Sequence, residues 1–254
     1  MFLKKKEIIR LLKRVNPDNI FYLAGQSSIP KSFILKKKTI NSNFKGAKNF
    51  VEILYKEKYE TRFFKANSGY IFKPKNGKIS LNCKLIKPNS PYVYAQQKAY
   101  NCIKQFRRKK VNCYNLLFMQ IESPLREDSF LIKKVCIHAK KNIKIKVGNI
   151  NTVRDYSWIE DIVDAIFFTT FLKPCDLILS SGTKMSGKQI LKFAYGFKNL
   201  DYKKYFSIDK KFFRKNERKT VIGSNIITKK RLKKFRWKPK IFGKKIVRKI
   251  FNSL

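Results

Sequence analysis

Short apolar runs alternate with longer stretches of helical spacing along the first half of the sequence. The apolar runs lie at 20–24, 62–66 and 113–118, and the first of them ends at Gly25. Runs of this length are typical of buried parallel strands. Apolar residues recur at helical spacing over 3–15, 43–55, 93–107 and 130–138. This alternation predicts an α/β fold built around a parallel sheet.

The pattern becomes less regular after residue 140. Further structured segments are expected at 144–148, 155–170 and 177–181, and a lysine-rich end begins at Asp209. We therefore predict a sheet domain over 1–140 and a smaller lobe over 141–254 that is interleaved with the last elements of the sheet.

Positive charge dominates the composition. The chain of 254 residues has 60 Lys and Arg against 16 Asp and Glu, a net charge of +44, yet 43% of its residues are hydrophobic and 22 are Phe. That apolar content is enough for a core and argues against disorder. The basic residues run from Lys4 to Lys249 and accompany heavy use of Asn, Ile and Phe, which favours compositional drift. Clusters such as 36–38 and 107–110 predict only non-specific binding of nucleic acid.

Metal, disulfide and membrane signals are absent from the sequence. The five cysteines are scattered and never spaced as C-x-x-C, which argues against a disulfide framework and a zinc site. No apolar window reaches the roughly 18 residues of a membrane span, and the first residues do not match a secretory signal. A cytoplasmic protein with no membrane partner is expected. His138, the single histidine, has no expected catalytic partner and is interpreted as structural.

Two motifs suggest a family. The segment A-N-S-G-Y-I-F at 66–72 follows a predicted strand, and P-N-S-P-Y at 88–92 opens a predicted helix. They resemble the A-S-T-S-E-x-Y-G and S-P-Y-x-x-x-K motifs of the extended short-chain dehydrogenase/reductase superfamily, and within it the GDP-mannose 4,6-dehydratases. In this alignment Ser68 falls on the catalytic Thr or Ser, and Tyr92 falls on the catalytic Tyr.

Other short matches follow in the same order. L-A-G-Q-S at 23–27 resembles L-A-A-Q-S, E-S-P-L-R at 122–126 resembles E-S-P-x-R, and Gly148 to Asp161 resembles G-N-x-x-x-x-R-D-W/Y-x-x-x-x-D. Residues 213–239 follow the family's closing F-R-P-x-E, G and G-W-K-P elements. Together these matches cover nearly the whole chain.

The resemblance implies a fold, a reaction and a set of binding residues. The fold is an NAD(P)-binding Rossmann-like sheet, here from its fourth strand onward, with a C-terminal substrate-binding lobe. Such enzymes oxidise C4 of a GDP-sugar by hydride transfer to NADP, remove water across C5 and C6, and return the hydride to C6. The implied cofactor-binding residues are Leu23, Ala24, Gly25, Gln26, Ser27 and Arg126. The implied substrate-binding residues are Gln120, Lys134, Arg154, Arg214 and Glu217.

Three departures from the family pattern bear on activity. Gln96 stands at the position of the Lys that would lower the pKa of Tyr92, and Tyr70 stands at the position of the Glu that would take the C5 proton. No Gly-rich turn precedes residue 20, so NADP binding is expected to suffer and the first strand to form an open edge. Tyr94 and Lys98 offer a shifted pair, but the shift rotates them by about 200° round the helix.

We therefore expect a GDP-mannose 4,6-dehydratase-like protein that is impaired or inactive. One alternative is a non-catalytic protein that binds nucleotide sugars, or that pairs with an active homologue, an N-terminal fragment or a second copy of itself. Polyanion binding through net charge is a weaker alternative.

Overall fold

The computed structural model describes residues 4–213 and 217–254 and divides into two compact units. The first unit contains the described residues up to 73, together with 80–118 and 166–179. The second contains 74–79, 119–165 and the described residues from 180 onward. The units differ in extent from the predicted ranges 1–140 and 141–254. Residues 166–179, late in the chain, belong to the first unit, and residues 74–79, early in the chain, belong to the second.

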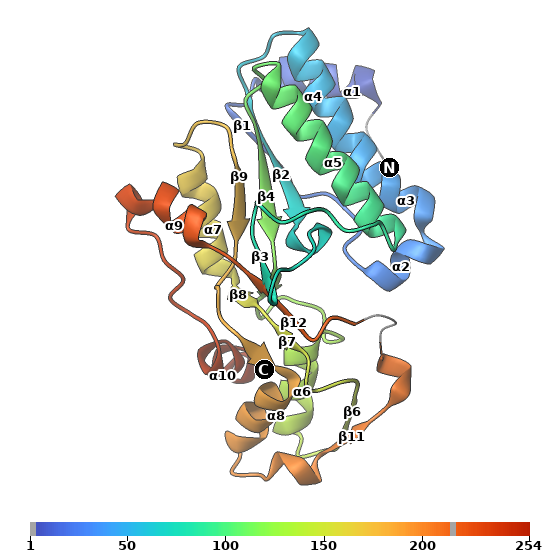
Figure 1. Cartoon of the computed structure of the whole chain (residues 1–254), viewed down its shortest axis with the longest axis vertical. Coiled ribbons are helices and arrows are strands. Elements are labelled where there is room, and N and C mark those ends of the chain that lie inside the picture. The colour runs from blue at the N-terminus through green and yellow to red at the C-terminus, as the bar shows by residue number, and fades with distance from the viewer. Residues whose placement is uncertain (1–3, 214–216) are drawn as a thin grey trace. The chain divides into compact units, whose positions relative to one another are not determined.

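The first unit is built on a four-stranded parallel sheet (Figure 1). Its strands lie in the order β1 (Asn19–Tyr22), β2 (Arg62–Ser68), β4 (Cys113–Phe118) and β9 (Asp176–Leu179), and every neighbouring pair is parallel. The predicted α/β fold with a parallel sheet is confirmed. Among the described residues β1 pairs with β2 alone, so β1 is an edge strand.

Helices α4 and α5 lie side by side in this unit (Figure 1). Ser90 begins α5, because its Oγ accepts from Val93 N at 3.2 Å and Pro91 occupies the first helical position. Apolar residues of α1, α4, α5 and the sheet, such as Leu12, Leu54 and Phe63, form one buried cluster. The helices are α1 (Lys5–Val15), α2 (Ile29–Ile34), α3 (Lys36–Ile40), the π-helix η1 (Asn41–Lys45), α4 (Gly46–Lys56), the short 3-10 helix η2 (Gly69–Ile71) and α5 (Pro91–Arg108).

A row of stacked aromatic rings crosses three strands of the sheet. Phe21, Phe64 and Tyr114 are register partners, and the ring centroids lie 4.9 Å apart in the first pair and 4.3 Å in the second. Phe64 and Tyr114 are buried, whereas Phe21, on the edge strand, is exposed. This row stabilises strand pairing by ring stacking and by burial.

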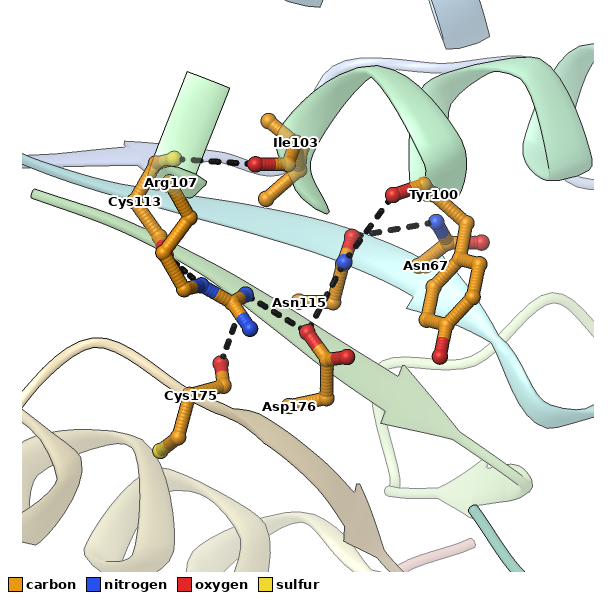
Figure 2. Close-up of polar contacts among 8 residues, drawn as sticks. All are labelled: Asn67, Tyr100, Ile103, Arg107, Cys113, Asn115, Cys175 and Asp176. Carbon is orange, nitrogen blue, oxygen red and sulfur yellow. Dashed lines mark hydrogen bonds and ion pairs between the residues drawn. The ribbon is translucent and has the colours of Figure 1, made fainter. Parts of the chain in front are cut away.

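Polar side chains form a network between α5 and the sheet (Figure 2). Asn115 on β4 donates through Nδ2 to Tyr100 O at 3.2 Å and to Asp176 Oδ1 at 3.0 Å. Arg107 donates to the same carboxylate oxygen at 2.5 Å and also to two backbone carbonyls, those of Cys113 and Cys175. Because the buried amide and the carboxylate are paired, the network fixes α5 on the sheet without an uncompensated charge.

The second unit combines short strands with three packed helices. Helices α6, α8 and α10 pack against one another around a buried cluster that includes Ile132, Tyr195 and Ile250. The strands pair as β10-β7-β12-β3, β11-β6 and β5-β8. The helices are α6 (Leu131–Lys140), α8 (Gly187–Gly196), α9 (Ile226–Arg231) and α10 (Lys244–Asn252), with the 3-10 helices η3 (Tyr202–Lys204), η4 (Lys210–Phe212) and η5 (Lys233–Phe235). Helix α7 (Ile159–Thr169) begins in the second unit, and its residues from 166 onward belong to the first. The strands are β3 (Lys78–Ile79), β5 (Gln120–Glu122), β6 (Ile145–Val147), β7 (Val153–Arg154), β8 (Tyr156–Trp158), β10 (Met185–Ser186), β11 (Phe206–Ile208) and β12 (Thr220–Gly223).

Asp155 connects the loops of this second unit. Its buried carboxylate accepts hydrogen bonds from the backbone N–H groups of Ser181, Gly182 and Gly223 at 3.0 to 3.1 Å. It also accepts from the Ser181 hydroxyl at 2.6 Å. A carboxylate with this many donors holds three separate backbone segments together.

The described residues contain neither a helix that could cross a membrane nor a group of three His, Cys, Asp or Glu side chains that could hold a metal ion. All five cysteines are free thiols, and Cys83 is the one that is not buried.

Candidate active site

Ser68 and Tyr92 come together in the first unit. Ser68 is the last residue of β2 and is buried, and its Oγ accepts from Tyr70 N at 3.2 Å. Tyr92 lies in the first turn of α5, and its phenol oxygen is hydrogen-bonded to the side chains of Ser68 and Gln96. The two residues that the family motifs single out are thus neighbours, although 24 positions separate them in the sequence.

Burial raises the pKa of Tyr92, and the hydrogen bonds from Ser68 and Gln96 oppose that rise only in part. Gln96 carries no charge to favour the phenolate. Tyr92 therefore keeps its proton at neutral pH, and a protonated phenol is a weak general base.

Gln96 connects α5 to the segment that follows β1. Its side chain is buried, and its Nε2 donates to Asn43 Oδ1 at 3.0 Å. Asn43 in turn donates to Gln26 O at 2.9 Å and Thr39 O at 3.2 Å. The Oε1 of Gln96 is buried and has no hydrogen-bond partner among the residues that the structure describes. One acceptor next to Tyr92 is therefore available to a ligand hydroxyl or amine.

The expected cofactor loop, 23–27, follows β1 directly. Leu23, Ala24, Gly25 and Ser27 are exposed, and Gln26 is half-buried, with its Nε2 donating to Ser28 O at 2.7 Å and Thr39 Oγ1 at 3.2 Å. A Cβ on Gly25 would lie 2.3 Å from Asn43 Oδ1. Glycine at this position lets the loop approach the asparagine that holds Gln96.

The remaining candidate residues of this unit differ in burial. Tyr70 is a half-buried residue of η2, two positions after Ser68. Tyr94 is 40% exposed, and the Nζ of Lys98 lies 5.6 Å from the centroid of its ring. The tyrosine that is hydrogen-bonded to Ser68 is Tyr92. The side chains of the shifted pair, Tyr94 and Lys98, are exposed.

Two of the expected substrate residues meet in the second unit. Arg154 on β7 is buried, and its Nη2 donates to Glu217 Oε1 at 3.1 Å. Lys134 is separate from this pair: its Nζ donates to Lys146 O at 3.1 Å and lies 4.6 Å from the centroid of the Phe212 ring. Gln120 is half-buried at the start of β5. Arg214 lies outside the described residues.

The guanidinium of Arg126 is engaged within the second unit. It donates to Ile121 O and to the Glu122 carboxylate, and it lies 3.7 Å from the centroid of the Phe130 ring. Burial raises the pKa of Glu122 to about 7 in spite of this partner. These contacts give Arg126 a structural role in anchoring the turn after β5.

Sequence reasoning did not assign a role to Asn43. Its hydrogen bond to Gln96 joins residues 53 positions apart, and no sequence pattern signals that contact. The contact between the buried amide of Asn43 and Gln96, at the family's lysine position, could be found only from the structure.

The comparison with protein families decides the assignment. The model of the family described as GDP-mannose 4,6 dehydratase matches residues 3–250. The chain belongs to this family. GDP-mannose 4,6 dehydratase 1 of Arabidopsis thaliana is 26% identical over 96% of this chain and 70% of its own length.

Solved structures agree on the fold. The structure of RMD from Pseudomonas aeruginosa complexed with NADPH matches with a TM-score of 0.82 and 19% identity, covering 98% of this chain and 85% of that one. The UDP-glucose 4-epimerase of Thermus thermophilus in complex with NAD matches with a TM-score of 0.83 and 15% identity, covering 98% and 81%. At these identities the likeness shows a shared Rossmann-like fold.

Proposed function

We propose that this chain is a GDP-mannose 4,6-dehydratase-type protein that binds a GDP-sugar and converts it slowly or not at all. The observation that carries the proposal is the hydrogen bond between Tyr92 and Ser68, next to a neutral Gln96. Family membership supports the substrate class, and the altered site supports the loss of rate. The chain contains no membrane-spanning helix among its described residues, and we propose the cytoplasm as its location.

A nicotinamide cofactor fits one end of this site. The buried and unpartnered Oε1 of Gln96 suits a ribose hydroxyl as donor, and we propose NADP, bound weakly, with loop 23–27 as a second contact. When bound, the cofactor would accept a hydride from the sugar. The chain's own residues must accept the accompanying proton, and Tyr92 does so poorly because its pKa is raised.

The elimination step lacks a carboxylate at the expected position. Removal of the C5 proton needs a base, and Tyr70 offers a phenol whose ordinary pKa is about 10. A neutral phenol at this position leaves the second step without an efficient proton acceptor at neutral pH. Both proton transfers are therefore expected to be slow, each by about two to four orders of magnitude.

The test is product formation from GDP-mannose and NADP, followed by mass spectrometry for loss of one water. We expect a trace or no product from the wild-type chain and a gain from the double variant Gln96→Lys with Tyr70→Glu. Tyr92→Phe in that background should abolish the gain, whereas Lys98→Gln should leave it unchanged. Efficient turnover by the wild-type chain that survives Tyr92→Phe would contradict the proposal.

A non-catalytic role is favoured by one observation, the ion pair between buried Arg154 and half-buried Glu217 at expected substrate positions. In this alternative the chain binds GDP-sugar alone, or pairs with itself, with an N-terminal fragment or with an active homologue. GDP-mannose should then raise the melting temperature while NADP does not, and Arg154→Gln should remove the shift. The absence of a shift with either ligand would exclude this role.

A further inference from the structure

The acidic residues are distributed unevenly. All 16 Asp and Glu lie at or before Glu217, and the segment from Arg218 to Leu254 has 14 Lys and Arg with no acidic residue. A general bias toward lysine codons explains lysines throughout the chain. It does not explain why the carboxylates stop at one position.

Twelve of these cations form what we call the basic strip, residues 229–249 of the second unit. Every one of the twelve side chains is exposed. They come from α9, η5, the loop after η5 and α10, and they are Lys229, Lys230, Arg231, Lys233, Lys234, Arg236, Lys238, Lys240, Lys244, Lys245, Arg248 and Lys249.

The basic strip is held in place by hydrogen bonds. Trp237 Nε1 donates to Asp161 O at 2.8 Å, and the backbone N–H groups of Lys240 and Ile241 donate to Asp161 Oδ2 at 2.9 Å. Before the strip, Asn225 donates to Ser180 O at 2.9 Å. These bonds fix the loop between η5 and α10, so the cations are presented by ordered backbone and not by a free tail.

The charges of the strip are not balanced within the described residues. Lys240 is the one strip residue there with a carboxylate partner, Asp164 at 3.6 Å, and both side chains are exposed. Lys249 lies over the ring of Trp158, and Lys244 and Arg248 lie over that of Phe197. Rings stabilise a cation without neutralising it. With no acidic residue among them in the sequence, these like charges repel one another, and an anionic polymer would relieve the repulsion.

We propose that the basic strip binds the phosphate backbone of nucleic acid without regard to sequence. Phosphates repeat along a nucleic acid, so exposed cations on an ordered stretch of chain can each neutralise one, and the guanidinium groups of Arg231, Arg236 and Arg248 suit phosphate oxygens. A membrane surface is disfavoured at α10 because its apolar side, including Ile246 and Ile250, is buried in the core, and the exposed Ile226, Ile227 and Phe242 are why vesicles are one arm of the experiment. That helix has no free apolar face to insert between lipids. The proposal is independent of the proposed dehydratase activity.

The experiment measures binding of the full chain to a labelled mixed-sequence DNA duplex by fluorescence anisotropy at several salt concentrations. About six phosphate contacts predict a slope of about −5 in log K against log salt, and a loss of about 10³ in affinity from 50 to 200 mM. The strip variant replaces Lys229, Lys230, Lys233 and Lys234 with Gln. The matched control replaces four exposed lysines of the first unit that lie outside the cluster 36–38, Lys6, Lys13, Lys45 and Lys56, with Gln, so the two proteins have equal net charge.

The strip variant should lose affinity and give a shallower salt dependence, with a slope smaller by about 0.9 for each contact removed. The control should keep the wild-type slope. Equal weakening in the two variants would overturn the assignment to the strip. Phosphatidylserine vesicles that bind as tightly as the duplex, or polyglutamate that displaces it equally well, would overturn nucleic acid as the partner. Because all replaced side chains are exposed, far-ultraviolet circular dichroism should confirm that each variant remains folded.

Discussion

The side chain of Lys65 is buried in the core of the first unit. It lies in β2 with 1% of its surface exposed, and its Nζ donates to Ala66 O and lies 5.5 Å from the centroid of the Tyr22 ring. Neither contact is with a carboxylate. Burial lowers its pKa from 10.5 to about 7. We predict that Lys65→Met stabilises the chain and makes its stability less dependent on pH.

The sign follows from proton counting. The folded state holds Lys65 neutral above pH 7, while the unfolded state keeps the proton up to about pH 10.5, so the unfolded state binds more protons in this window. The free energy of unfolding of the wild-type chain therefore rises with pH, by about 1.4 kcal/mol per pH unit. Methionine has a stem of similar length and no proton to lose. Its advantage should be about 4 kcal/mol near pH 7.5 and about 1 kcal/mol near pH 9.5.

Urea unfolding followed by far-ultraviolet circular dichroism at these two pH values measures the difference, since both tryptophans lie in the other unit. Lys36→Met provides the control, because it makes the same substitution at an exposed side chain of the same unit. Parallel stability curves for wild type and Lys65→Met across this range would refute the argument that a neutral, desolvated amine is buried beneath the helices.

Three further predictions concern two buried carboxylates and a pair of glycines. Asp155→Ala leaves several buried donors without an acceptor and should lower the free energy of unfolding by about 4 kcal/mol in urea titrations, with Asp155→Asn losing less. Glu122, with a pKa raised to about 7 from 4.5, binds more protons when folded, so stability should fall from pH 4.5 to 7, and tryptophan fluorescence should show that Glu122→Gln flattens this slope. Gly25→Ala should cost about 1 to 3 kcal/mol by displacing Asn43, whereas Gly196→Ala, with open space around it, should be neutral or stabilising in thermal melts.

Periodicity in the sequence located the strands and the longer helices of the first unit, but not the short helices α2 and α3. The strand expected at 113–118 matches β4, and the helix expected at 93–107 is α5, extended at its start because Ser90 caps it and Pro91 opens it. The second unit could not be predicted to the same extent. Its strands β7 and β10 have two residues each, too few for an alternating pattern, and β3 joins it from the middle of the first half of the chain.

The candidate site depended on recognising motifs, not on periodicity. Ser68 and Tyr92 were located by the resemblance, which aligned both without a gap. The sequence also showed that Gln96 replaces the positively charged lysine of the family motif with a neutral side chain. It could not show that Asn43 binds the amide of Gln96, or that Lys65 is buried nearby in the same sheet, because both facts depend on how distant segments pack.

The open edge of β1 has a consequence for handling the protein. Among the described residues β1 pairs with β2 alone, and Phe21 on this strand and Leu23 directly after it are exposed; an open strand edge of this kind favours strand pairing between copies. At low salt the net charge of +44 keeps copies apart. Salt near 1 M shortens the screening length to about 3 Å and removes that protection. High-salt purification, the usual remedy for a basic protein that retains nucleic acid, should therefore cause this one to self-associate.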